Sequence, residues 1–281
     1  MKYQIIASMA LCLPLICSCS GNKKAEQQIQ PEKSKTLVLY YSQTGATHTV
    51  ADELQQLLGA EIDSIVAAQS YGYDYDATIE RWTKEREDSV KVAIKPLSRN
   101  INDYDTIYLG FPIWGGTYAA PVATFLADNS LEGKTVITFA TFGSGGIESA
   151  TKDVAGIQPK ADVKEGYGVR SSRLAKSPQE LKRFLISNGY MKGDITPLPE
   201  YGEATPVNEV EGEIFKEACG NYRFPLGTPV SVATRSYDGI TDYRYDVKSE
   251  TPEGKEINSV IYVVKEPDSI PVFTKVVRYP I

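Results

Sequence analysis

The sequence predicts an α/β fold, a three-layer sandwich on a five-stranded parallel sheet, followed by a small C-terminal α+β domain. Three observations support this. Short apolar segments rich in β-branched residues alternate with amphipathic helical segments between residues 36 and 190. Loops rich in glycine or hydroxyl side chains follow the strand segments. Beyond residue 197 apolar and polar residues alternate with period two, which is typical of antiparallel strands.

Within the predicted α/β domain, residues 36–196, each element has its own signal. In the first helix Val50, Leu54, Leu57 and Leu58 fall on one helical face. The predicted strands cover 36–41, 61–66, 106–111, 135–142 and 161–169. The later helices are predicted over 78–93, 120–128, 147–155 and 178–189, the last capped by Ser177. In such a sheet the ligand binds beyond the carboxyl ends of the strands.

The C-terminal domain is predicted to span residues 197–281, since Pro197, Pro199 and Gly202 mark a boundary. An antiparallel meander packed on one helix is expected. The helix is predicted over 210–220 and the strands over 230–237, 242–249, 259–265 and 271–279. No chemistry can be assigned to this domain: gating a ligand, docking a partner, binding a small ligand and plain structural support all stay open.

The first residues predict export. An apolar run from Ile5 to Cys17 follows Lys2 and is shorter than the about 20 residues that a stable transmembrane helix needs. The segment 16–19, Ile-Cys-Ser-Cys, resembles the bacterial lipoprotein signal, so residues 1–18 are the predicted signal peptide and Cys19 the acylated residue. An ordinary cleavage site is the alternative. Two or more buried acyl chains anchor a protein stably to a membrane surface.

The predicted location is therefore the bacterial cell envelope, on the periplasmic or surface side of a membrane. Residues 19–35 are polar and lack periodicity, so they read as a tether. The chain carries 30 basic and 36 acidic residues, a net charge of −6. An acidic surface argues against a nucleic-acid partner, whose phosphates need a basic footprint.

A hydroxyl-rich loop, residues 42–47, joins the first strand directly to the first helix. A helix N-terminus offers unpaired N–H groups and favours an anion by roughly 0.3 to 2 kcal/mol. The loop has no Lys or Arg, so it predicts a phosphate monoester held by neutral donors. A hydroxyl-rich helix cap without a ligand is the alternative.

Two later loops strengthen the case for a ligand. Trp114 is expected on a rigid loop between Pro112 and Pro121, outside the main core, where a planar ligand can stack on it. A tryptophan covering a helix end is the alternative. The glycine-rich segment 141–146 offers backbone N–H groups to the polar edge of a ring system. Tyrosines 71, 73 and 75 either wall the ligand or pack on the sheet.

Three motifs in this order resemble the flavodoxin family: "SQTGAT", "YDTIYLGFPIWGGTYAAPVATFL" and "GKTVITFATFGSGG". The resemblance covers residues 36–190 and implies FMN as cofactor and electron transfer as activity. It further implies a phosphate site of Ser42, Gln43, Thr44, Gly45, Ala46 and Thr47, with Pro112, Ile113, Trp114 and Gly115 facing the ring and Thr141, Phe142 and Gly143 closing its other side. Ala46 stands where many relatives have Asn, and Phe142 where they have Tyr.

The expected function is that of an FMN-binding electron carrier, with a redox partner protein or a small quinone-like substrate. One alternative is an NAD(P)H-dependent flavin or quinone reductase whose pocket includes Tyr118. A cofactor-free binding lipoprotein is the other. The sequence shows no nucleophile with its base and no metal-ligand cluster, so no catalytic residue and no metal site are predicted. His48, the single histidine, is more typical of a helix surface than of a catalyst.

Overall fold

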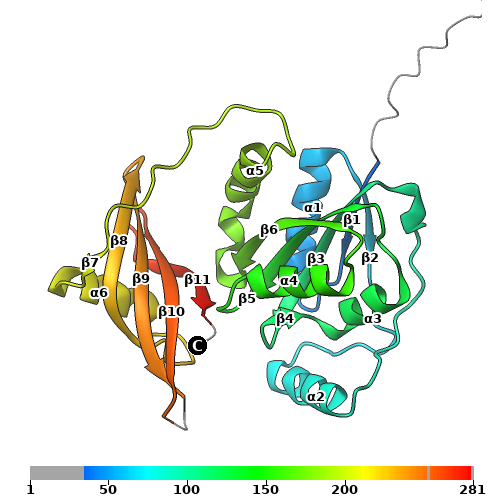
Figure 1. Cartoon of the computed structure of the whole chain (residues 1–281), viewed down its shortest axis with the longest axis horizontal. Coiled ribbons are helices and arrows are strands. Elements are labelled where there is room, and N and C mark those ends of the chain that lie inside the picture. Colours follow the sequence, from blue (N-terminus) through cyan, green and yellow to red (C-terminus); the bar gives the residue numbers. More distant parts are fainter. Residues whose placement is uncertain (1–34, 252–253, 280–281) are drawn as a thin grey trace, which may run out of the picture. The chain divides into compact units, whose positions relative to one another are not determined.

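The computed structural model describes residues 35–251 and 254–279, and within them it contains two sheets (Figure 1). The first has five parallel strands in the order β2-β1-β3-β5-β6. A two-residue strand, β4 (Thr117–Tyr118), pairs antiparallel with the end of β3. The predicted α/β class and five-stranded parallel sheet are confirmed. The predicted signal peptide, tether and Cys19 lie outside the described residues, apart from Lys35 at the tether's end.

Helices and strands of the first sheet region alternate along the chain. The parallel strands are β1 (Thr36–Tyr40), β2 (Glu61–Ser64), β3 (Thr106–Trp114), β5 (Thr135–Phe142) and β6 (Asp162–Arg170). The helices are α1 (Ala46–Leu58), α2 (Tyr75–Glu87), α3 (Ala120–Asp128), α4 (Glu148–Ile157) and α5 (Ser177–Ser187).

Strand β1 shows how the three layers are held together. Leu37 and Leu39 point into one core cluster, which includes Phe125 of α3. Val38 points to the other face, into a cluster with Leu54 of α1 and further residues of α5. All three β1 side chains are completely buried. An apolar run without alternation is what a strand covered on both faces requires.

Several predicted helix bounds differ from the structure: α2 ends at Glu87 and not at residue 93, and the starts of α2 and α5 differ as well. Helix α2 begins at Tyr75, three residues before the predicted start, because the Asp74 side chain caps it by accepting a 2.7 Å hydrogen bond from the Ala77 N–H. Tyr75 is therefore the first residue of this helix. Ser177 is the first residue of α5 and not its cap: its buried hydroxyl lies 2.7 Å from a carboxylate oxygen of Glu53.

The C-terminal region forms a separate antiparallel sheet in the order β11-β10-β9-β8-β7, as predicted except for β7. Asp238 and Gly239 in its turn have φ angles of 49° and 78°. Positive φ at both residues is what a two-residue hairpin turn needs to match the right-handed twist of its strands. Helix α6 buries Ile214, Phe215 and Cys219 against the sheet. The elements are β7 (Thr205–Pro206), α6 (Glu209–Cys219), β8 (Thr228–Tyr237), β9 (Ile240–Glu250), β10 (Glu256–Lys265) and β11 (Val272–Arg278).

The domain boundary at residue 196 stays a prediction. None of the helices in the described part of the chain combines the length and the apolar character that a bilayer-spanning segment needs.

Candidate functional site

The carboxyl ends of β1, β3 and β5 lie at one edge of the parallel sheet, since Tyr40 pairs with Gly110 and Pro112 with Thr141. A cavity of about 620 Å³ opens at this edge. Ten of the thirteen predicted site residues line it: Gln43, Thr44, Thr47, Pro112, Ile113, Trp114, Gly115, Thr141, Phe142 and Gly143. Ser42 and Gly45 line a neighbouring cavity, and Ala46 lines neither of these two.

The start of α1 presents backbone donors. Gly45, with φ of 94°, turns the chain into the helix. The Ser42 hydroxyl oxygen accepts from the N–H groups of Gly45 and His48, each at 3.2 Å. Within the described chain the N–H groups of Ala46 and Thr47 have no acceptor. These two groups, together with the exposed Thr44 hydroxyl, leave neutral donors for an anion at a helix N-terminus.

Two buried threonines connect the start of α1 to the end of β5. Thr47 Oγ1 and Thr141 Oγ1 lie 2.8 Å apart, and both residues are buried. Their hydroxyls satisfy each other in the core, so this contact fixes the start of α1 against the glycine-rich loop.

Replacing Thr47 with valine is expected to destabilise the protein by about 1 to 3 kcal/mol, because the Thr141 hydroxyl then stays buried without a partner. Thr141→Val should cost a similar amount. In the double variant both hydroxyls are gone, and the free energy of unfolding should recover most of the loss. A urea-denaturation double-mutant cycle measures the coupling; strictly additive losses would contradict a direct bond.

The Gln43 side chain is held in place by protein groups. Its Oε1 accepts a hydrogen bond from the Tyr41 hydroxyl, and its Nε2 donates to the Gly72 carbonyl. The Gly72 segment is itself held by α2, since Arg81 donates to the Ser70 carbonyl at 2.8 Å. The 42–47 loop, the 70–74 segment and α2 therefore form one connected network.

Helix α2 also supports the tyrosines of this segment. The Arg81 guanidinium lies 3.9 Å from the centroid of the Tyr71 ring, and Tyr71 donates to Glu85. Burial raises the pKa of Tyr71, and the hydrogen bond with Glu85 raises it further. Tyr71 packs on the protein, whereas Tyr73 and Tyr75 are exposed and line the cavity.

The prediction for Trp114 is wrong in two respects. Trp114 is the last residue of β3 and only 8% exposed, so it belongs to the main core. Its indole makes edge contacts with Tyr71 and Tyr41, with ring centroids 4.9 and 5.9 Å apart. The strand continues through Pro112 because β1 pairs with β3 only as far as Gly110, and a proline is tolerated where a strand has lost a neighbour.

Phe142 is also a core residue, only 4% exposed. A side chain added at Gly168 would come 2.8 Å from its ring. Trp114 and Phe142 both line the cavity, but each presents only part of a ring to it.

Residues of the C-terminal region line the same cavity, and sequence reasoning did not identify them. They include Tyr222, Phe224 and Arg278. Their local sequence carries only a strand or turn pattern, so only the tertiary structure brings them to the site. Nearby, burial by itself would raise the pKa of Glu148, but the hydrogen bond and charge of Lys275 outweigh it, so the pKa is lowered.

His48 has the contacts of a helix-surface residue. Its Nδ1 lies 2.7 Å from the Tyr40 hydroxyl, and its Nε2 lies 3.2 Å from Asp52 one turn along α1. No cluster of His, Cys, Asp or Glu in residues 35–251 and 254–279 could hold a metal ion.

The parallel strand order β2-β1-β3-β5-β6, with helices on both faces and a cavity at the carboxyl edge, is that of the flavodoxin-like fold. The family model for flavodoxin matches residues 35–185, more than half of the chain. The chain therefore belongs to the flavodoxin family.

Solved structures similar to this chain include two from Bacteroides. A putative flavoprotein from Bacteroides eggerthii DSM 20697 is 31% identical over 55% of this chain and 97% of that chain, with a TM-score of 0.49. A putative flavoprotein from Bacteroides uniformis ATCC 8492 is 31% identical over 54% and 99%, with a TM-score of 0.48. A Lactobacillus acidophilus NCFM flavoprotein in complex with FMN is 20% identical over 53% and 97%, with a TM-score of 0.43. No curated protein matches the chain.

Proposed function

We propose that this protein binds FMN in the cavity at the carboxyl edge of its parallel sheet and carries electrons in the bacterial cell envelope. The observation that carries the proposal is the meeting of three loops at one cavity, one of them with unpaired N–H groups at the start of α1. Membership of the flavodoxin family supports the same cofactor.

The residues fit the two ends of this cofactor differently. Thr44 and the N–H groups at the start of α1 offer neutral donors to the phosphate, where the helix dipole also favours an anion. Ile113, Trp114 and Phe142 offer apolar surface to the ring. The volume of about 620 Å³ is in the usual range for small-molecule sites. The bound flavin supplies the redox chemistry, and the protein binds and orients it.

The absorption spectrum of the purified protein tests this proposal first. A yellow protein with the visible flavin bands, releasing FMN and not riboflavin on denaturation, is the expected result. A colourless protein that stays colourless after incubation with FMN would refute the proposal and favour the alternative of a cofactor-free binding lipoprotein.

A second candidate is an NAD(P)H-dependent flavin or quinone reductase. It is favoured by Tyr222 and Phe224, which extend the cavity wall beyond the three predicted loops. Tyr118, the residue expected in its substrate pocket, is instead buried with its ring against Phe111. Rapid anaerobic bleaching of the flavin by NADH or NADPH would support a reductase, and slow or absent bleaching an electron carrier.

The envelope location depends on acylation of Cys19. Cys19→Ala is expected to move the protein from the membrane fraction to the soluble fraction of the envelope, because the acyl chains that anchor it are lost. Cys17→Ala is the matched control and should leave fractionation unchanged. A Cys19→Ala variant that stays in the membrane fraction would rule out Cys19 as the anchor.

A further inference from the structure

The glycine-rich loop that follows β5, residues 143–146, is hydrogen-bonded to the C-terminal sheet. The Val276 N–H of β11 donates to the Gly145 carbonyl at 3.0 Å. The preceding residue of β11, Lys275, places its Nζ 2.6 Å from Glu148 at the start of α4. Two successive residues of β11 therefore hold this loop and the helix that follows it.

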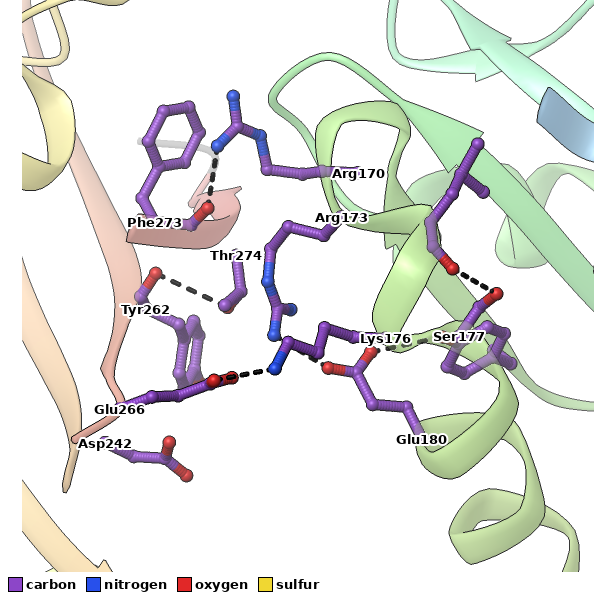
Figure 2. Close-up of polar contacts among 12 residues, drawn as sticks. Arg170, Arg173, Lys176, Ser177, Glu180, Asp242, Tyr262, Glu266, Phe273 and Thr274 are labelled. Carbon is purple, nitrogen blue, oxygen red and sulfur yellow. Dashed lines mark hydrogen bonds and ion pairs between the residues drawn. The ribbon is translucent and has the colours of Figure 1, made fainter. Parts of the chain in front are cut away.

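Arg170, the last residue of β6, makes a third connection. Its Nε donates to the Gly143 carbonyl at 2.6 Å, and its Nη1 donates to the Phe273 carbonyl of β11 at 2.7 Å. Figure 2 shows the second of these bonds, with the guanidinium beside the Phe273 ring at 3.4 Å from its centroid. Burial lowers the pKa of Arg170, but an arginine stays charged at neutral pH.

The loop depends on such outside contacts. Three of its four residues are glycines, which have no side chain to restrict the backbone and therefore lose the most entropy when they are ordered. Hydrogen bonds to the carbonyls of Gly143 and Gly145 fix the orientation of their peptide groups. The same loop lines the cavity.

We propose that Arg170 is a positioning residue of the cofactor site, and that the C-terminal region acts on this site by holding loop 143–146 through Arg170 and β11. The identity of the ligand rests on the proposed function above, whereas the positioning of the loop does not. The C-terminal sheet is then part of the flavin site and not only a support for the fold.

A second contact between the same two regions supplies a matched control. Lys176 Nζ lies 2.6 Å from a carboxylate oxygen of Glu266, the residue directly after β10 (Figure 2). Neither residue lines the cavity. If both contacts only hold the two regions together, removing either one should change the mobility of loop 143–146 to the same extent. If Arg170 positions the loop, removing Arg170 should make the loop more mobile, and removing Lys176 should not.

The test uses the full chain with Arg170→Gln, Arg170→Lys and Lys176→Gln. Hydrogen–deuterium exchange of segment 143–146 is measured without ligand, and FMN and riboflavin are titrated separately. Arg170→Gln should speed exchange of the segment about tenfold and weaken both flavins by a similar factor, because the loop is expected to face the ring and not the phosphate. Arg170→Lys, which keeps the charge but has one donor nitrogen where arginine has three, should show a smaller effect confined to this segment. Lys176→Gln should have the same exchange rate in segment 143–146 and the same flavin affinities as the parent protein.

Parental exchange in Arg170→Gln would overturn the proposal, and so would an equal increase in Lys176→Gln. If Arg170→Gln loosens the whole chain, Arg170→Lys decides: an increase confined to 143–146 supports the proposal, and an increase everywhere or nowhere overturns it. Failure of the parent to bind FMN would refute the proposed function alone, because the exchange comparison needs no ligand.

Discussion

Replacing Thr44 with aspartate is expected to weaken FMN binding by about 10-fold to about 1000-fold while the fold stays intact. Thr44 is exposed and lines the cavity beside the start of α1. A carboxylate there would occupy the anion position itself and repel a phosphate. Two negative unit charges about 4 Å apart repel each other by about 4 kcal/mol at an effective dielectric constant near 20. Even half of that weakens binding more than about 10-fold, and the full cost approaches about 1000-fold.

The same substitution should leave the free energy of unfolding equal or raise it by about 0.3 to 1 kcal/mol, since a negative charge is favourable near a helix N-terminus. Thr44→Asn is the matched neutral control and should lose less than about tenfold in FMN affinity. Affinity is measured by fluorescence titration and stability by urea denaturation. Equal FMN affinity of the Asp and Asn variants would place the phosphate elsewhere.

The largest effect on stability is expected at Gly115. Gly115 and Gly116 both have positive φ, 56° and 89°, so an alanine strains the backbone at either position. They differ in their surroundings. A Cβ at Gly115 would lie 2.1 Å from the Trp82 indole, whereas a Cβ at Gly116 would meet nothing within 4 Å. Trp82 is itself buried, so it cannot move aside cheaply.

Gly115→Ala is therefore expected to cost about 2 to 4 kcal/mol, because overpacking adds to the backbone strain. Gly116→Ala should cost only about 1 kcal/mol. Urea denaturation of both variants measures the difference. Similar losses would show that Trp82 does not press on the turn between β3 and β4.

Periodicity and turn residues predicted most of the fold. Helix α3 and strand β5 have the predicted bounds at both ends, because turn residues such as Asn129 and Gly133 bracket them. The prediction failed where tertiary contacts decide. Pro112 marks a strand end on local rules, yet β3 continues past it once β1 no longer pairs alongside. Asp74, an aspartate of the kind that often caps helices, could have indicated the start of α2, but the prediction did not use it.

The candidate site was predictable only in part. The loop at 42–47 has a local signature, because hydroxyl side chains directly before a helix place neutral donors beside its N-terminus. The burial of Trp114 depends on Tyr71, which is brought to it by a segment held by Arg81. Likewise the C-terminal residues that line the cavity share no motif with it. Such long-range contacts leave no periodic trace in one sequence.

Calorimetric titration of the cofactor-free protein with FMN and with riboflavin tests the central claim most directly. The account predicts one FMN per chain, quenched tryptophan emission and riboflavin bound at least about tenfold more weakly, because the helix N-terminus contributes more than about 1.4 kcal/mol to the phosphate. Equal affinities for the two flavins, or no heat and unchanged emission at saturating FMN, would contradict it.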